Sequence, residues 1–332
     1  MNMETLDMEY SILDDGTIEI TKYNGKGGNV VIPSSIEGKK VTSIGEDAFG
    51  GCDSFTNITI PNSITSIGDY AFYECIQLAS ITIPYSVNYI GYCAFEFCTN
   101  LIRINVETGN EKYSSENGIL YNHDKTKLIC YPAGKKETSF SIPDSVTSIC
   151  TFAFKGCESL TSVTIPSSVT NLGDNVFEHC INLSSIIIPD GVTSIGGGTF
   201  AYCTSLTSIT IPNSVTNICD YAFFICKSLT TITIPNSVTE IGRCAFYNCS
   251  NLASITIQDS VISIGKEAFF KCNSLSSIII PGSVASIYKY ALGYGRICNN
   301  NYEKIPDFKI YCYQGTVGEK YAKFHGFDYE LI

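Results

Sequence analysis

The chain has 332 residues, and its 32 acidic and 21 basic side chains give a formal net charge of −11. Such a chain lacks the basic footprint that nucleic-acid binding needs, and an anionic membrane surface would repel it. Hydrophobic residues make up 44% of the chain and charged residues only 16%, which predicts an ordered protein. We therefore expect no nucleic-acid partner.

The first ten residues, MNMETLDMEY, lack the basic segment and the following apolar segment of a secretory signal. No run of roughly 18 apolar residues occurs, so no transmembrane segment is expected in this chain. Either the protein is cytoplasmic, or its export signal lies outside this sequence.

Residues 1–29 are predicted to form an N-terminal hairpin cap. Two alternating segments, Met8–Leu13 and Thr17–Tyr23, flank the turn sequence Asp14-Asp15-Gly16. The region that follows is repetitive, and the open end of a repeat array exposes core and strand edges unless a cap covers them.

A 23-residue repeat occupies residues 30–106 and, after an interruption, residues 143–294. Pro235–Ile257, reading PNSVTEIGRCAFYNCSNLASITI, shows its frame of Pro, Val, Ile, Ala-Phe, Cys and Leu positions with variable polar residues between them. A fixed apolar frame at a constant period is typical of a solenoid. Ten turns are legible in the Phe column, at Phe49, Phe72, Phe95, Phe154, Phe177, Phe200, Phe223, Phe246, Phe269 and, in its last place, Leu292.

Each turn contains a strand and a sharp bend. Leu252–Ile257 alternates apolar and polar residues, which predicts a strand with one buried face, and the Pro that ends each such segment cannot extend a ladder. Gly242 permits a bend into Arg243–Asn248, which we expect to be a short helical or 3₁₀ turn with Phe246 directed inward.

Residues 107–142 break the period. They form an irregular repeat that lacks the Ala-Phe and Cys columns. Within it, Gly118–Tyr121 and Lys127–Tyr131 flank the polar segment Asn122–Thr126, which predicts a β-hairpin insertion that projects from the rod.

Residues 295–332 are predicted to form the C-terminal cap. Thr316 is the expected N-cap of a helix, with Glu319 three residues later in the position of a capping box. The expected elements are a strand at Phe308–Tyr313, the helix at Thr316–His325 with Gly326 as its stop, and a last strand at Phe327–Leu331.

The repeated pattern IPxSVTSIGxxAFxxCxxLxSIT resembles the BspA-like, or treponemal-type, leucine-rich repeats of bacterial surface proteins. The resemblance covers nearly the whole chain, including Tyr113–Tyr121 of the irregular repeat and Gly315–Ala322 near the end. It implies one leucine-rich repeat domain over residues 1–332. The expected fold is a right-handed superhelix with a parallel β ladder on one face and short helical or 3₁₀ turns on the other. It also implies a secreted or surface-attached protein that binds a protein ligand, such as a host matrix component.

Nine of the sixteen cysteines recur in one column of the repeat. Their 23-residue spacing does not bring four ligands to one point, as zinc requires, and a ladder of inward-pointing cysteines lacks disulfide geometry. We predict buried free thiols, which in an exported protein would suit a reducing or anaerobic habitat. The column consists of Cys52, Cys75, Cys98, Cys157, Cys180, Cys203, Cys226, Cys249 and Cys272.

No residues are arranged for catalysis. The three histidines are His123 in the predicted hairpin turn, His179 beside a core cysteine and His325 in the C-terminal cap. A thiol enzyme needs a Cys and a His that converge in a pocket, and no paired carboxylates, phosphate loop or repeated calcium motif occurs. We expect no enzyme activity, no metal site and no cofactor.

Aromatic residues outside the core columns gather in the second and third turns, and aromatic side chains are effective anchors for protein ligands. Outward positions of the adjacent strands add polar contacts. We predict a partner-binding site here, although the same residues would also suit simple packing beneath the irregular repeat. The candidates are Tyr70, Tyr73, Thr82, Tyr85, Tyr89, Tyr92, Phe97 and Arg103.

Three functions are compatible with the sequence. The favoured one is protein–protein interaction in adhesion at a bacterial surface. Glycan binding by the Ser/Thr and Tyr faces is the second, and a cytoplasmic interaction scaffold is the third.

Overall fold

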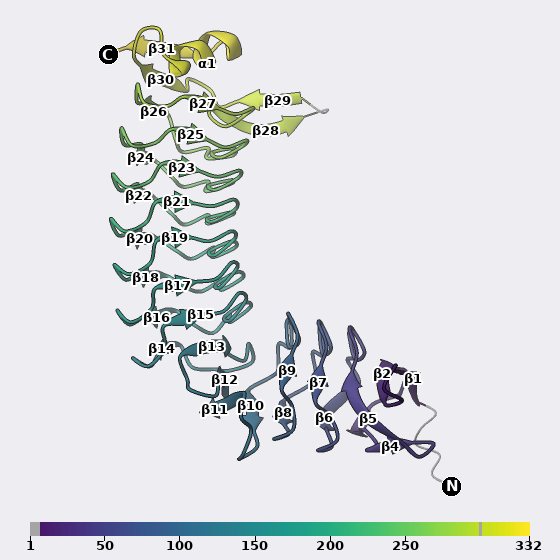
Figure 1. Cartoon of the computed structure of the whole chain (residues 1–332). Helices are drawn as coiled ribbons and strands as arrows, with labels where there is room; N and C mark the ends of the chain where they lie inside the picture. Colours follow the sequence, from purple (N-terminus) through teal and green to yellow (C-terminus); the bar gives the residue numbers. More distant parts are fainter. Residues whose placement is uncertain (1–6, 299–300) are drawn as a thin grey trace. The chain divides into compact units, whose positions relative to one another are not determined.

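The computed structural model describes residues 7–298 and 301–332. The chain divides into two compact units, one formed by Met1–Lys136 with Phe152–Cys157 and the other by Glu137–Thr151 with Glu158–Ile332. In both units stacked turns carry parallel ladders, so the predicted solenoid is confirmed (Figure 1). Residues 1–6 of the predicted N-terminal cap and 299–300 of the C-terminal cap lie outside the described residues.

The first unit contains two ladders that both run along its turns. The predicted N-terminal hairpin is present, because β1 and β2 pair antiparallel. The first ladder consists of β1 (Met8–Ile12), β2 (Ile18–Tyr23), β5 (Lys39–Ile44), β7 (Ser66–Ile67) and β9 (Tyr89–Ile90), with β4 (Ser35–Ile36) pairing beside β5. The second consists of β3 (Gly28–Val31), β6 (Phe55–Thr59), β8 (Ser80–Ile83) and β10 (Arg103–Val106).

The irregular repeat contains the predicted hairpin as β12 (Ile119–Asn122) and β13 (Lys127–Cys130), preceded by a further antiparallel strand, β11 (Tyr113–Glu116). The expectation that this hairpin projects is wrong. Ile119, Leu120 and Tyr121 are buried, and Leu120 belongs to the same hydrophobic core as the preceding turns. Tyr131 takes the place of the Phe column in this repeat, since its ring stacks on that of Phe154 with centroids 5.2 Å apart.

The second unit repeats the two-ladder plan. Strands of one ladder are three or four residues long and those of the other are two residues long. The longer strands are β14 (Ser139–Ser141), β16 (Ser162–Thr164), β18 (Ser185–Ile187), β20 (Ser208–Thr210), β22 (Thr231–Thr233), β24 (Ser254–Thr256) and β26 (Ser277–Ile280). The shorter ones are β15 (Ser148–Ile149), β17 (Asn171–Leu172), β19 (Ser194–Ile195), β21 (Asn217–Ile218), β23 (Glu240–Ile241), β25 (Ser263–Ile264) and β27 (Ser286–Ile287).

The C-terminal cap matches the expected helix and strands. β30 (Lys309–Cys312) and β31 (Asp328–Leu331) continue the ladder of β26 in parallel. Helix α1 (Val317–His325) begins after Thr316 and ends at Gly326, whose φ of 64° gives the left-handed stop. Glu319 accepts a hydrogen bond from the backbone N–H of Gly315 at 2.6 Å. The sequence did not predict the antiparallel hairpin β28 (Tyr294–Cys298) and β29 (Asn301–Lys304).

The bends differ from the expected helical or 3₁₀ turns. Each regular bend places two residues in the left-handed region, as at Cys244 (φ 52°) and Asn248 (φ 57°). Between these two residues, the Phe246 N–H donates to the Ala268 carbonyl of the next turn at 2.8 Å. Alternate N–H groups of the bend therefore bond to the neighbouring turn, while others bond within the bend, as the Tyr247 N–H does to the Cys244 carbonyl at 3.1 Å.

The core is a stack of identical side chains. Successive rings of the Phe column lie nearly parallel, with centroids 5.4 Å apart between Phe200 and Phe223 and 5.1 Å apart between Phe223 and Phe246. All three side chains are fully buried. Because each turn places the same residue over the same neighbour, one favourable packing arrangement is repeated along each unit.

Candidate functional site

The cysteines of the repeated column have a structural role, because their thiols hydrogen-bond to backbone carbonyls in the core. The thiol of Cys226 donates a hydrogen bond to the Phe200 carbonyl at 3.0 Å, and the thiol of Cys272 donates to the Phe246 carbonyl at 3.1 Å. The same contact recurs from Cys75 to Phe49, Cys98 to Phe72, Cys203 to Phe177 and Cys249 to Phe223. These six cysteines are buried free thiols, as the sequence predicted.

Burial also makes these thiols unreactive. It raises the pKa of Cys203, Cys226 and Cys249 well above the ordinary value, and raises that of Cys272 to about 12. The thiolate is the nucleophilic form of cysteine, so none of these four side chains is suited to covalent catalysis near neutral pH.

Four of the predicted partner-binding residues form a ring cluster on the bends of the first unit. The ring of Tyr70 meets those of Tyr73 and Tyr92 edge to face at centroid distances of 5.8 and 6.0 Å. Tyr73 meets Phe97 in the same manner at 5.6 Å. The structure thus brings together residues that lie up to 27 positions apart, because consecutive bends stack.

A lysine anchors this ring cluster. The ammonium of Lys155 lies 4.8 Å from the ring centroid of Phe97 and 4.6 Å from that of Phe152, and it pairs with Glu96. The Lys155 and Glu96 side chains are only 11% and 7% exposed. A cavity of about 530 Å³ lies beside them, lined by Glu46, Asp47, Tyr70, Tyr73, Glu96, Phe97, Phe152 and Lys155.

Three predicted tyrosines are about half exposed. These are Tyr85, Tyr89 and Tyr92. Asp69 orients two of them, since its Oδ1 accepts a hydrogen bond from the Tyr89 hydroxyl at 3.3 Å and from the Tyr92 N–H at 2.8 Å. Glu107 accepts a hydrogen bond from the Tyr85 N–H at 3.1 Å.

The remaining predicted residues lie in a different sheet. Thr82 belongs to β8 and Arg103 to β10, and both side chains are exposed. Tyr89 belongs to β9 in the other ladder, while Tyr85 follows β8. The eight candidates therefore divide between two faces, with the ring cluster and Tyr89 associated with one and Thr82, Tyr85 and Arg103 with the other.

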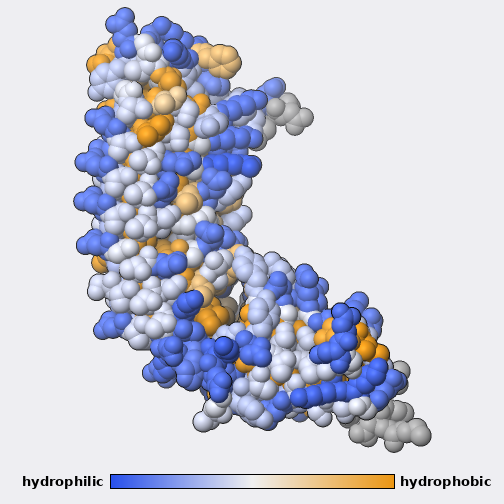
Figure 2. Space-filling view, viewed as in Figure 1, coloured by the Kyte–Doolittle hydropathy of each residue, from blue (hydrophilic) through white to orange (hydrophobic). Residues whose placement is uncertain are grey.

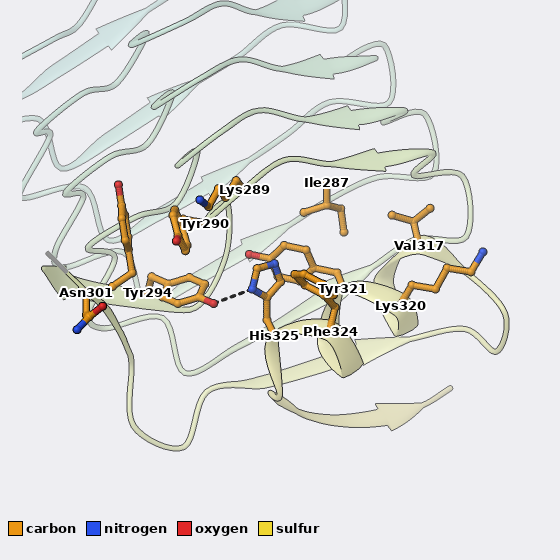
Figure 3. A pocket seen from close by; sticks show the side chains of 11 residues that line it. Ile287, Lys289, Tyr290, Tyr294, Asn301, Val317, Lys320, Tyr321, Phe324 and His325 are labelled. Atoms are coloured by element: carbon orange, nitrogen blue, oxygen red, sulfur yellow. Dashed lines mark hydrogen bonds between the residues drawn. The ribbon is translucent and has the colours of Figure 1, made fainter.

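A second candidate site lies in the C-terminal cap (Figure 3). It is a pocket of about 950 Å³ between the end of β27, the hairpin β28–β29 and helix α1. Figure 3 shows Tyr294, Tyr321 and His325 close together, with Lys289 and Lys320 on opposite sides of them. The lining residues are Ile287, Lys289, Tyr290, Tyr294, Asn301, Tyr302, Val317, Lys320, Tyr321, Phe324 and His325.

Several of these side chains are held in place by specific contacts. The rings of Tyr290 and Tyr302 stack with centroids 3.5 Å apart, and the Tyr294 hydroxyl hydrogen-bonds Nδ1 of His325 at 2.8 Å. The buried Tyr321 hydroxyl accepts a hydrogen bond from the Leu292 N–H at 3.1 Å. Burial, together with the positive charges of Lys304 and Lys289, lowers the pKa of His325 and favours its neutral form.

In contrast, Phe324 is 85% exposed. Hydrophobic patches are also visible at the C-terminal end of the second unit, whereas much of the remaining surface of that unit in this view is pale or hydrophilic (Figure 2).

The sequence contained a signal for this pocket that the repeat pattern obscured. The segment Tyr288–Tyr294 reads YKYALGY and places tyrosines where the Phe column ends in Leu292. These tyrosines stand at positions that the 23-residue pattern does not specify. Their presence in the last turn therefore indicates a role other than packing of the repeat. The pocket depends on the hairpin β28–β29, which forms a two-stranded sheet separate from both ladders.

No metal site is found within residues 7–298 and 301–332, where no group of three His, Cys, Asp or Glu side chains converges. In the same part of the chain, no helix has the length and apolar character needed to cross a bilayer.

Comparison with known proteins identifies the repeats. The family described as "BspA type Leucine rich repeat region (6 copies)" matches residues 28–133, 129–253 and 193–318. A leucine-rich repeat protein from Eubacterium ventriosum is 26% identical, with a TM-score of 0.66, over 90% of this chain and 98% of its own. A leucine rich cell surface protein from Faecalibacterium prausnitzii is 26% identical, with a TM-score of 0.57, over 75% and 93%. No curated protein matches closely enough to count as a relative.

Repeats of this bacterial surface type serve in general as protein-binding or adhesion surfaces, and such solenoids are generally not enzymes. The predicted relationship to BspA-like repeats is thereby confirmed. The expectation of a single domain over residues 1–332 stays a prediction.

Proposed function

The chain belongs to the BspA-type leucine-rich repeat family, and on that premise we propose that it is a non-enzymatic protein-binding module that acts in adhesion at a bacterial surface. Its ligand is a protein, such as a host matrix component or another cell-surface protein. The similarity to a described cell surface protein supports an extracellular location.

The observation that carries this proposal is the exposure of Tyr89 and Tyr92 on one face of the first unit, with Tyr85 exposed on the other. Tyrosine is enriched at the energetic centres of protein interfaces because it buries a large rigid ring while its hydroxyl stays hydrogen-bonded. Tyr89 and Tyr92 are oriented by Asp69, and Tyr92 also packs edge to face on Tyr70 and Phe152. Ordered side chains of this kind lose little conformational entropy on binding.

The proposal is tested by measuring binding of the purified protein to a panel of immobilised matrix and cell-surface proteins. We expect at least one panel protein to bind. The triple variant Tyr85→Ser/Tyr89→Ser/Tyr92→Ser should weaken that binding by about tenfold or more. The matched control, Tyr288→Ser/Tyr313→Ser, removes exposed tyrosines from the second unit and should bind like the parent protein.

Two results would contradict the proposal. Absence of binding across the panel would argue against the adhesive function. Unchanged binding by the triple variant, with an unchanged melting temperature, would show that these tyrosines do not contribute to the binding interface.

A cytoplasmic scaffold is the second candidate, and the free thiols of the cysteine column favour it. Disulfides are rare where thiols are kept reduced, and Cys226 and Cys249 are examples of buried thiols that stay free. Digestion of intact producing cells with an external protease separates the two locations. Loss of the protein supports the surface, whereas full protection supports the cytoplasm.

A further inference from the structure

We propose that the pocket of the C-terminal cap binds an acidic saccharide, that is, a sugar ring that carries a carboxylate. This inference goes beyond the proposed protein binding, because it concerns another unit of the chain and another class of ligand. It rests on the shape of the pocket, on the aromatic faces that line it and on the charges at its rim.

The pocket has the size and the wall of a small-ligand site. Its volume of about 950 Å³ lies within the range of known ligand pockets and exceeds the volume of a single sugar ring. Phe324 on α1 presents an exposed ring, whereas Tyr290 stacks on Tyr302 and has the Lys289 ammonium 4.8 Å from its ring centroid. Aromatic faces carry negative partial charge, which attracts the polarised C–H groups on the face of a sugar ring.

The polar groups in the pocket lining favour a ligand with hydroxyl groups. The Tyr294 hydroxyl and His325 Nδ1 hydrogen-bond each other at 2.8 Å, and Tyr290 and Asn301 add a hydroxyl and an amide to the lining. A lipid chain would cover these polar groups without replacing their hydrogen bonds to water, which is unfavourable. A small inorganic anion would leave the aromatic faces uncovered. A saccharide has C–H faces and hydroxyls in one molecule and can satisfy both.

The charges favour an anionic ligand. The lining contains Lys289 and Lys320 and no Asp or Glu, although the whole chain has a net charge of −11. The Lys289 ammonium lies 4.8 Å from the ring centroid of Tyr290, and the charge of Lys320 adds to the effect of Lys323 in lowering the pKa of Glu319.

Two carboxylates close to the pocket already have partners. Glu319 binds Lys323 and the Gly315 N–H, and Glu267 accepts a hydrogen bond from the Tyr302 hydroxyl. Lys289 and Lys320 lie on opposite sides of the pocket (Figure 3), so each can offer its ammonium to a ligand carboxylate from its own side.

The test compares two sugars that differ only at C6. Methyl β-D-glucuronide carries a carboxylate there, and methyl β-D-glucoside carries a hydroxymethyl group. We expect the glucuronide to bind the full chain with a dissociation constant of about 1 mM, in line with its small size. The glucoside should bind about fivefold more weakly, and this preference should shrink as salt is raised from about 50 to about 500 mM. Calorimetry gives the affinities, and saturation-transfer NMR shows whether the ring C–H groups contact the protein.

Variants locate the site. Lys289→Gln and Lys320→Gln should each reduce the preference for the glucuronide, and together they should abolish it. Lys227→Gln is the matched control, because it removes one exposed positive charge of the same unit outside the pocket lining. Phe324→Ser should lower the affinity for both sugars by about threefold, since it removes an exposed ring without opening the core. Thermal melts verify that each variant is folded.

The proposal is overturned if neither sugar binds at about 20 mM, or if both bind equally. It is also overturned if the double lysine variant keeps the preference. Phenylacetate, a flat anion without hydroxyls, tests the saccharide class. Binding of phenylacetate as tightly as the glucuronide would assign the pocket to an aromatic or peptide acid instead. None of these outcomes bears on the tyrosine variants of the first unit.

Discussion

The thiol of Cys249 donates a hydrogen bond to the carbonyl oxygen of Phe223, one turn earlier, at 3.2 Å. That carbonyl also accepts the N–H of Cys226 at 3.3 Å. Cysteine therefore supplies two things at this position, a side chain small enough for the crowded bend and a weak donor for the second lone pair of a buried carbonyl. The repetition of this contact explains why cysteine occupies the column.

Replacement of Cys249 by Ala should lower the free energy of unfolding by about 1–2 kcal/mol, because the carbonyl loses a partner and the sulfur leaves a small void. Urea denaturation monitored by circular dichroism measures the change. Cys52→Ala is the control, since Cys52 starts the column and is only partly buried. An equal effect at Cys52 and Cys249 would contradict the role assigned to the thiol contact.

Stability should fall as the pH rises above about 8.5, the ordinary pKa of a cysteine thiol in an unfolded chain. Burial raises the pKa of Cys203, Cys226 and Cys249 in the folded state, and that of Cys272 to about 12. Between the thiol pKa of the unfolded chain and the raised pKa of the folded chain, the unfolded chain loses thiol protons that the folded chain keeps. Ionisation of the thiols therefore favours unfolding. The contribution of the protonated thiols to the free energy of unfolding is complete below about pH 8 and is lost progressively above about pH 8.5.

Urea midpoints between about pH 7 and about pH 9.5, measured with a reducing agent, test this dependence before tyrosines of the unfolded chain ionise. The double variant Cys226→Ala/Cys249→Ala should show a shallower decline than the parent. A midpoint that stays constant over this range would contradict the prediction.

Ile225→Asn should raise the free energy of unfolding by about 1 kcal/mol, because Ile225 is a β-branched residue in the left-handed region at φ 61°. Asn tolerates this conformation, and Asn248 already occupies the equivalent position one turn later at φ 57°. Chemical denaturation provides the measurement. The exposed Ile262, whose φ is not positive, serves as the control, and Ile262→Asn should change stability by less than about 0.5 kcal/mol.

Glu96→Gln should destabilise the first unit by about 3 kcal/mol, since the nearly buried ammonium of Lys155 loses the charge of the Glu96 carboxylate. The double variant Glu96→Gln/Lys155→Met should recover most of that loss, because Met fills the space between Phe97 and Phe152 without a charge. A double-mutant cycle by urea unfolding measures the coupling. If the effects of the two substitutions on the free energy of unfolding are additive, the interaction between Glu96 and Lys155 does not contribute to stability.

Most of the fold could be predicted because a periodic sequence folds into a periodic structure. The 23-residue spacing places each Phe over the Phe of the preceding turn, so the core column and the strand that faces it follow from one repeat. The N-terminal hairpin and helix α1 were also predictable, because their signals act locally. These signals are the turn sequence Asp14-Asp15-Gly16 and the left-handed stop at Gly326.

The sequence by itself thus determined the repeat, its inward columns, the N-terminal hairpin and helix α1. Only the tertiary structure decided the left-handed bends, the burial of the hairpin around Tyr121, the division of the tyrosine candidates between two faces and the pocket beside α1. The physical reason is that periodic contacts depend on spacing alone. The pocket instead requires Tyr290, Tyr302 and Phe324 to line one space from three segments that follow no common period.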